Sequence, residues 1–137
     1  PPPREAVGLP GGGPVVSSHN APFKWSPPYL GAVVRLLTDF PTAVLWLPPS
    51  PPGTRARILR ELGKRGLPGA GLRVVFAEAA FEGASHVSIK SLADIALDTH
   101  WFNGHSTAAD TISGGIPLVT APGRGAYARV AASLLLS

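Results

Sequence analysis

Residues 94–133, which read DIALDTHWFNGHSTAADTISGGIPLVTAPGRGAYARVAAS, decide the fold. A short apolar run over residues 95–97 leads into a polar loop, and a helix is predicted to begin at Ser106. After two glycines, the run 116–120 predicts a second strand, and Pro122-Gly123 lead into a helix of small residues. Open parallel sheets bind ligands at the carboxyl ends of their strands, and an exposed helix N-terminus is a natural anion site. We therefore expect the functional loop between residues 98 and 106.

The upstream residues show the same alternation of apolar runs and amphipathic segments. Strands are expected over residues 14–18, 43–47 and 72–76, and helices after the caps Ser26 and Thr54 and over residues 86–93. Strands that alternate with helices predict an α/β fold, a Rossmann-like parallel sheet flanked by helices. Residues 1–13 are rich in proline and glycine and predict a flexible N-terminal segment, which leaves 14–137 as one lobe.

Composition excludes several classes of protein. The 137 residues suffice for one domain, and 45% hydrophobic against 15% charged residues indicates a folded body rather than disorder. There is no cysteine, so disulfides are excluded, and the sequence is compatible with a reducing compartment. No apolar run reaches the roughly 18 residues of a membrane helix, and no secretory signal is visible. The chain begins with proline, has no methionine, and stops at residues 133–137 inside an expected helix, which together predict a fragment truncated in its C-terminal part.

The net charge of +4 favours anionic ligands in general. The basic residues are scattered, with one modest cluster from Arg55 to Arg65. Nucleic-acid binding would need a basic stripe interleaved with aromatic residues. A solvated helix face explains this cluster better, so neither nucleic acid nor membrane is expected as a partner.

Ordered motifs give the chain a family resemblance. Residues 86–135, HVSIKSLADIALDTHWFNGHSTAADTISGGIPLVTAPGRGAYARVAASLL, carry Leu97-Asp98-Thr99, Asn103-Gly104-His105-Ser106-Thr107, Gly115-Ile116-Pro117 and Arg129-Val130-Ala131-Ala132-Ser133, and Phe23-Lys24 and Val44-Leu45-Trp46-Leu47 precede them. This pattern resembles the C-terminal catalytic lobe of the protein O-GlcNAc transferase and SPINDLY family. The likeness covers about residues 15–135.

The resemblance implies one lobe of a GT-B glycosyltransferase that moves N-acetylglucosamine from UDP-N-acetylglucosamine to Ser and Thr of proteins, in the cytoplasm or nucleus. No metal or other cofactor is expected. The expected partners are the nucleotide sugar, a protein or peptide acceptor and the N-terminal lobe, and it stays open whether helical repeats accompany them. The SPINDLY branch uses GDP-fucose, whereas the loop around His105 favours the UDP branch. The second lobe supplies the proposed base, so the isolated chain is expected to be inactive.

Residue roles carry over by position in the motifs. His105, Ser106 and Thr107 would hold the pyrophosphate, within a nucleotide-sugar loop that includes Asn103 and Gly104. Asp110 would bind the ribose, His86 would pack on the uracil, and Lys24 would stabilise the phosphates of the leaving UDP. Many relatives have Gln at the place of Ala21, and Glu82 or Gly83 stands where the family has a lysine.

Elementary chemistry agrees with these roles. A helix N-terminus carries roughly +0.5 of a charge and several unbonded N–H groups, so it can receive phosphate oxygens without a metal. A lysine beside the β-phosphate would stabilise the charge that develops when the glycosidic bond breaks. Asp110 lies one turn deeper on the same helix face as Thr107, within reach of a neighbouring diol.

Two other functions are compatible with the residues. Asp98, His100, His105 and Asp110, with His19 or His86 added, are legitimate ligands for a metal-dependent hydrolase. The alternative role for Asp98 is that of a structural acceptor for the N–H groups of its loop. Ala21 and the missing family lysine would also suit a non-catalytic nucleotide-binding or interaction module, a decayed transferase lobe.

Overall fold

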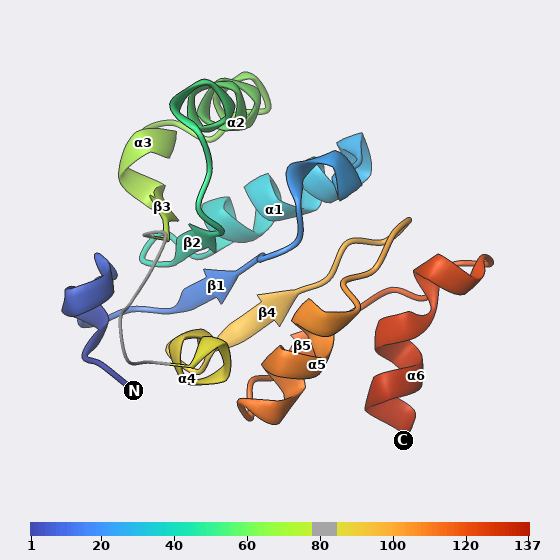
Figure 1. Cartoon of the computed structure of the whole chain (residues 1–137). Helices are drawn as coiled ribbons and strands as arrows, with labels where there is room; N and C mark the ends of the chain where they lie inside the picture. The colour runs from blue at the N-terminus through green and yellow to red at the C-terminus, as the bar shows by residue number, and fades with distance from the viewer. Residues whose placement is uncertain (78–84) are drawn as a thin grey trace.

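The computed structural model describes residues 1–77 and 85–137, and its centre is a five-stranded parallel sheet (Figure 1). The strands are β1 (Val15–Ser17), β2 (Val44–Leu47), β3 (Val74–Phe76), β4 (Ile95–Leu97) and β5 (Leu118–Val119). Their order is β3-β2-β1-β4-β5, and every neighbouring pair is parallel. The chain therefore starts in the middle of the sheet, builds one half outward and then crosses β1 to build the other. This topology confirms the predicted Rossmann-like α/β fold.

Helices cover both faces of the sheet (Figure 1). They are α1 (Pro27–Asp39), α2 (Pro52–Lys64), α3 (Ala70–Arg73), α4 (His86–Lys90), α5 (Ser106–Ser113) and α6 (Val130–Leu136), with 3-10 turns η1 (Arg4–Val7), η2 (Pro22–Lys24) and η3 (Ala126–Ala128). As predicted, Ser26 caps α1, because its hydroxyl accepts a hydrogen bond from the Tyr29 amide at 3.3 Å. No helix within residues 1–77 and 85–137 is long and apolar enough to cross a membrane.

The period-two alternation of the strands divides the core into two layers. Val16, Leu45 and Leu47 pack with the buried face of α1 and with Ile58 and Leu62 of α2. Their strand neighbours Val15 and Trp46 point to the other face and pack with Val7, Leu9, Leu92 and Ala93. Near-continuous apolar runs such as 43–47 are expected where both faces of a parallel sheet are buried.

The N-terminal segment differs from its prediction. Residues 4–7 form η1, and Val7 and Leu9 are buried against the face of the sheet that carries Val15. The Arg4 guanidinium donates to Leu92 O at 3.0 Å and pairs with Asp94 at 2.9 Å. The proline and glycine content of residues 1–13 predicted a flexible segment. Two apolar side chains and one arginine instead anchor part of it to the sheet.

Several boundaries also differ. Helix α2 begins at Pro52, two residues before the predicted cap Thr54, because proline suits the first helical turn. Residues 70–73 form α3 instead of the start of β3, and the Arg73 guanidinium donates to the carbonyls of Leu37, Phe40 and Ala43. The predicted strand 116–120 shortens to β5, and the predicted helix 86–93 ends at Lys90.

Candidate functional site

The candidate site lies where the sheet changes direction, between the neighbouring strands β1 and β4. The chain leaves β1 towards α1 and β2 on one side, and it leaves β4 towards α5 and β5 on the other (Figure 1). The loops 18–26 and 98–105 therefore diverge at the carboxyl edge, which creates the crevice where sheets of this kind bind ligands. The predicted loop between residues 98 and 106 thus lies at the carboxyl edge of the sheet.

Asp98 ties the loops of this edge together. Its Oδ1 accepts hydrogen bonds from Asn20 Nδ2 at 3.0 Å and from the Gly104 amide at 2.9 Å, and its Oδ2 accepts from Thr120 Oγ1 at 2.8 Å. The carboxylate is buried, so these partners replace water around both oxygens. The prediction of a structural acceptor is confirmed. Gly104 is required beside it, since a Cβ there would overlap Asn20 Oδ1.

Asn103 is also structural. Its buried side chain donates from Nδ2 to Thr99 O at 2.8 Å and accepts at Oδ1 from the Ala131 amide at 3.2 Å. Its backbone amide donates to Tyr127 O at 2.8 Å. The side chain therefore joins the 98–105 loop to the first turn of α6. A contact between this amide side chain and a nucleotide, as predicted, would require these bonds to break.

The N-terminus of α5 opens at the crevice. His105 is the N-cap residue, and no side chain of the described residues caps the helix. The side chains of His105 and Ser106 are exposed and that of Thr107 is half-buried. The N–H groups of the first turn, which form the positive end of the helix dipole, can therefore donate to an acceptor from outside the helix. This is the geometry that the sequence predicted for a phosphate site.

Lys24 lies at the same edge although it comes from the loop after β1. Its Nζ donates to Asn103 O at 3.3 Å and sits 4.5 Å from the centroid of the Phe102 ring. Phe102 in turn lies parallel to the His105 ring, with 5.6 Å between centroids, and to the Tyr127 ring at 5.1 Å. The structure therefore brings Lys24 and His105 together around Phe102, whose part the sequence did not reveal.

Asp110 lies one turn into α5 and is half-buried. Its Oδ2 accepts a hydrogen bond from Lys90 Nζ at 3.0 Å, an ion pair between α5 and α4. His86 begins α4 with an exposed side chain. Lys90 was missed by the sequence analysis. It follows His86 by one helical turn, but only the packing of α4 on α5 reveals its partner.

His19, in the loop after β1, is held neutral. Its ring packs edge-on against Trp46, with 4.7 Å between centroids. The pKa of His19 is lowered from 6.5 to about 4. The larger cause is burial of the ring, and the smaller is the positive charge of Lys90. Nearby, burial raises the pKa of the Tyr29 hydroxyl, which is hydrogen-bonded to Ser18.

The residues of the proposed metal site do not converge. Both oxygens of Asp98 are bonded within the protein, Asp110 pairs with Lys90, and His100 Nδ1 is bonded to Ala121 O at 2.7 Å. In residues 1–77 and 85–137, no three of His, Asp and Glu gather as a metal site would require. These contacts disfavour the hydrolase alternative. Glu82 and Gly83 lie outside the described residues.

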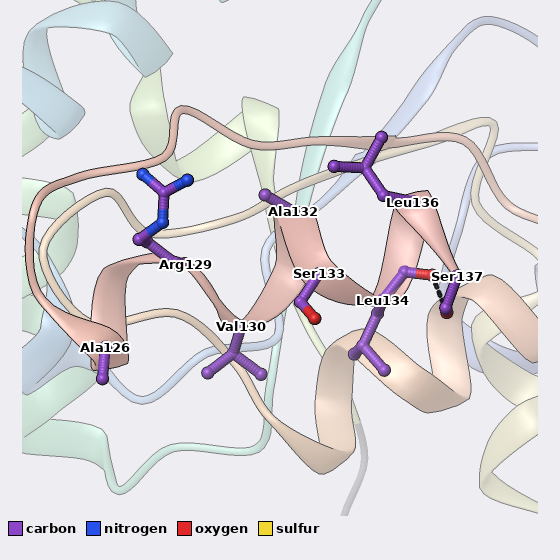
Figure 2. Close-up of a pocket in the computed structure, with 8 residues that line it drawn as sticks. All are labelled: Ala126, Arg129, Val130, Ala132, Ser133, Leu134, Leu136 and Ser137. Carbon is purple, nitrogen blue, oxygen red and sulfur yellow. Dashed lines mark hydrogen bonds between the residues drawn. The ribbon is translucent and has the colours of Figure 1, made fainter.

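A separate hollow lies beside α6 (Figure 2). Arg129, Ala132 and Leu136 run along one side of that helix, and Val130 and Leu134 along the other (Figure 2). The residues that line this hollow all fall between 126 and 137 and include none of those predicted to bind the nucleotide. Arg129 donates to Gly123 O at 3.2 Å, which makes it a brace for its own loop.

Comparisons with known proteins find relatives of this chain. The model of the family "Glycosyl transferase family 41" matches residues 2–137. The chain is 35% identical over 121 residues to a UDP-N-acetylglucosamine–peptide N-acetylglucosaminyltransferase of Caenorhabditis elegans, covering 88% of this chain and 10% of that protein. It is 29% identical over 136 residues to the probable enzyme of this name, SEC, of Arabidopsis thaliana, covering 99% of this chain and 14% of SEC.

Solved structures add the same likeness in three dimensions. A mutant of the Thermobaculum terrenum O-GlcNAc transferase superposes with a TM-score of 0.80 at 28% identity, covering 90% of this chain and 24% of that one. The Anabaena protein Alr3699/HepE, solved with UDP and glucose, gives a TM-score of 0.57 at 16% identity, covering 93% and 33%, a likeness of fold alone. The chain thus spans a small part of each of these relatives.

Proposed function

Since the chain belongs to glycosyl transferase family 41, we propose that it is the nucleotide-sugar-binding lobe of a protein O-glycosyltransferase. The complete enzyme would move N-acetylglucosamine from UDP-N-acetylglucosamine to Ser and Thr hydroxyls of proteins in the cytoplasm or nucleus. The fold is that of one GT-B lobe, as predicted. The observation that carries the proposal is the N-terminus of α5, which no described side chain caps, at the crevice between the loops after β1 and β4. The Lys24 ammonium lies beside the same loop.

Each predicted residue has a place in this proposal. The pyrophosphate would accept hydrogen bonds from the first-turn amides of α5 and from the side chains of His105, Ser106 and Thr107. Asp110 would accept from the ribose hydroxyls, and His86 would pack on the uracil. Asn103 and Gly104 would contribute by shaping the loop, since the side chain of the first and the amide of the second are already bonded.

Charge stabilisation would be the catalytic contribution of this lobe. When the acceptor oxygen attacks the anomeric carbon, the bond from that carbon to the β-phosphate oxygen breaks and UDP leaves with the electron pair. Lys24 and the positive end of α5 would stabilise that negative charge without a metal. The proton of the acceptor hydroxyl would pass to a base on the second lobe. We therefore expect the 137-residue chain alone to be inactive.

Calorimetric titration with UDP and with GDP tests the nucleotide and the site together. UDP should bind more tightly than GDP, and His105→Ala should weaken UDP binding roughly tenfold or more, because one hydrogen bond to a charged phosphate is worth about 1.5–3 kcal/mol. His100→Ala is the matched control, since this exposed histidine in the same loop faces the Ala121 carbonyl. Preference for GDP would refute the UDP assignment, and binding of neither nucleotide would favour a non-catalytic interaction module.

Inactivity of the isolated lobe has its own measurement. The chain is incubated with UDP-N-acetylglucosamine and a Ser- and Thr-containing peptide, and the peptide mass is followed. No transfer is expected. Any peptide that gains an N-acetylhexosamine would show that the base resides in this chain and would overturn the division of labour between lobes.

A further inference from the structure

We propose that Lys90 is a positioning residue for nucleoside recognition: it holds the Asp110 carboxylate in the orientation that accepts hydrogen bonds from ribose hydroxyls. This inference rests on the proposed function, because it assigns a ligand to the carboxylate. It concerns a residue for which no motif in the sequence suggests a role.

The ion pair has one nearly buried end and one partly exposed end. The Lys90 side chain is only 13% exposed, whereas Asp110 is 38% exposed. A nearly buried ammonium must find a partner, since its hydration is lost. The partner is the oxygen Oδ2 of Asp110, 3.0 Å away across the contact between α4 and α5. One end of the pair is thus fixed inside the protein and the other reaches the surface.

The remaining oxygen of Asp110 is what a ligand would meet. Asp110 is the fifth residue of α5, beyond the first turn, so the unbonded amides of the helix end are not its partners. A carboxylate offers about four lone-pair positions, and one ammonium bond leaves most of them available. With Oδ2 held by Lys90, rotation of the carboxylate is restricted, and Oδ1 keeps one direction without loss of side-chain entropy on binding.

A purely structural link between α4 and α5 makes a different prediction. In that case removal of Lys90 would lower stability and would affect every ligand of the crevice alike. If Lys90 acts through Asp110 on the ribose, the effect must depend on the ribose hydroxyls. Comparison of UDP with its dideoxyribose analogue, which lacks both hydroxyls, separates the two roles.

The experiment titrates wild type, Lys90→Met and Lys64→Met with both nucleotides by calorimetry. Methionine keeps the apolar stem and removes the charge. Lys64 is the matched control, because it forms an ion pair with Glu61 at 3.5 Å while 64% exposed. Lys90→Met should weaken UDP binding roughly tenfold and leave dideoxy-UDP binding unchanged. Lys64→Met should change neither affinity.

Each outcome has one reading. Equal loss for both nucleotides, or no loss for UDP, overturns the positioning role while leaving the proposed function intact. If wild type binds neither nucleotide, the proposed function itself fails, and the inference fails with it. Should Lys90→Met not fold by circular dichroism, Lys90→Gln retains a neutral donor. Its UDP affinity should fall by a smaller factor, again only when the ribose hydroxyls are present, and an equal fall for both nucleotides overturns the proposal.

Discussion

His19 should make the stability of this lobe sensitive to acid. The ring is packed edge-on against the fully buried Trp46, and no hydrogen-bond partner of its buried Nε2 occurs in the described part of the chain. Burial, with the charge of Lys90 second, lowers the pKa of this imidazole from 6.5 to about 4. Folding therefore keeps His19 neutral at a pH where the unfolded chain binds a proton.

The sign and size follow from proton linkage. The folded pKa is the lower one, so this contribution to stability is present above pH 6.5 and is lost progressively as the pH falls towards 4. Each unit of pKa difference corresponds to about 1.4 kcal/mol, so the full interval amounts to about 3 kcal/mol. That is a large share of the roughly 5–15 kcal/mol by which domains are usually stable.

Urea unfolding at several pH values from about 4 to about 7 measures this effect when wild type is compared with His19→Phe. Phenylalanine keeps the aromatic contact with Trp46 and cannot be protonated. The free energy of unfolding of wild type should fall relative to that of the variant by about 3 kcal/mol over this range. His100→Phe, at an exposed histidine, serves as control and should follow wild type. Parallel curves for wild type and His19→Phe would refute the reasoning.

Three substitutions probe the contacts that shape the site and the sheet. Gly104→Ala should destabilise the lobe by about 1–3 kcal/mol, because its Cβ would overlap the Asn20 side chain; an unchanged urea midpoint would mean that the loop has room. Asp98→Asn should cost about 1–3 kcal/mol, since an amide replaces an acceptor of three hydrogen bonds, and wild-type stability in denaturant would contradict this. Arg73→Met should lower the free energy of unfolding by about 1–3 kcal/mol, because three carbonyls lose their donor. Arg35→Met, at an exposed ion pair, is the control and should leave the thermal midpoint unchanged. Equal losses of stability in the two variants would argue against the Arg73 bonds.

Much of the fold could be predicted because its signals are local. Apolar runs such as 43–47 mark strands, and Ser26 followed by prolines marks a helix start. The N-terminal segment could not be predicted in this way. Val7 and Leu9 are two isolated apolar residues among prolines and glycines, and their burial depends on a sheet face that β1 and β2 create only after they pair.

The arrangement of the candidate site at the carboxyl edge of the sheet was predictable in outline and less so in detail. Ser106 at the start of α5 and Asp98 as an acceptor follow from the order of loop and helix. The inward orientation of Asn103 does not, because its partner Ala131 lies 28 residues away in α6. The pairing of Lys90 with Asp110 likewise depends on how α4 packs against α5, which residue spacing along one helix cannot show.

The loop before α5 is held in place before any ligand arrives. Asp98 fixes the Gly104 amide, Asn103 fixes the first turn of α6, and Lys24 bonds the Asn103 carbonyl. The last two of these bonds join segments that are far apart in sequence, so the chain entropy of ordering the loop is spent during folding. Fixed donors stabilise developing charge better than donors that must first reorient. A positive helix end held in this way would suit the leaving diphosphate of the proposed reaction.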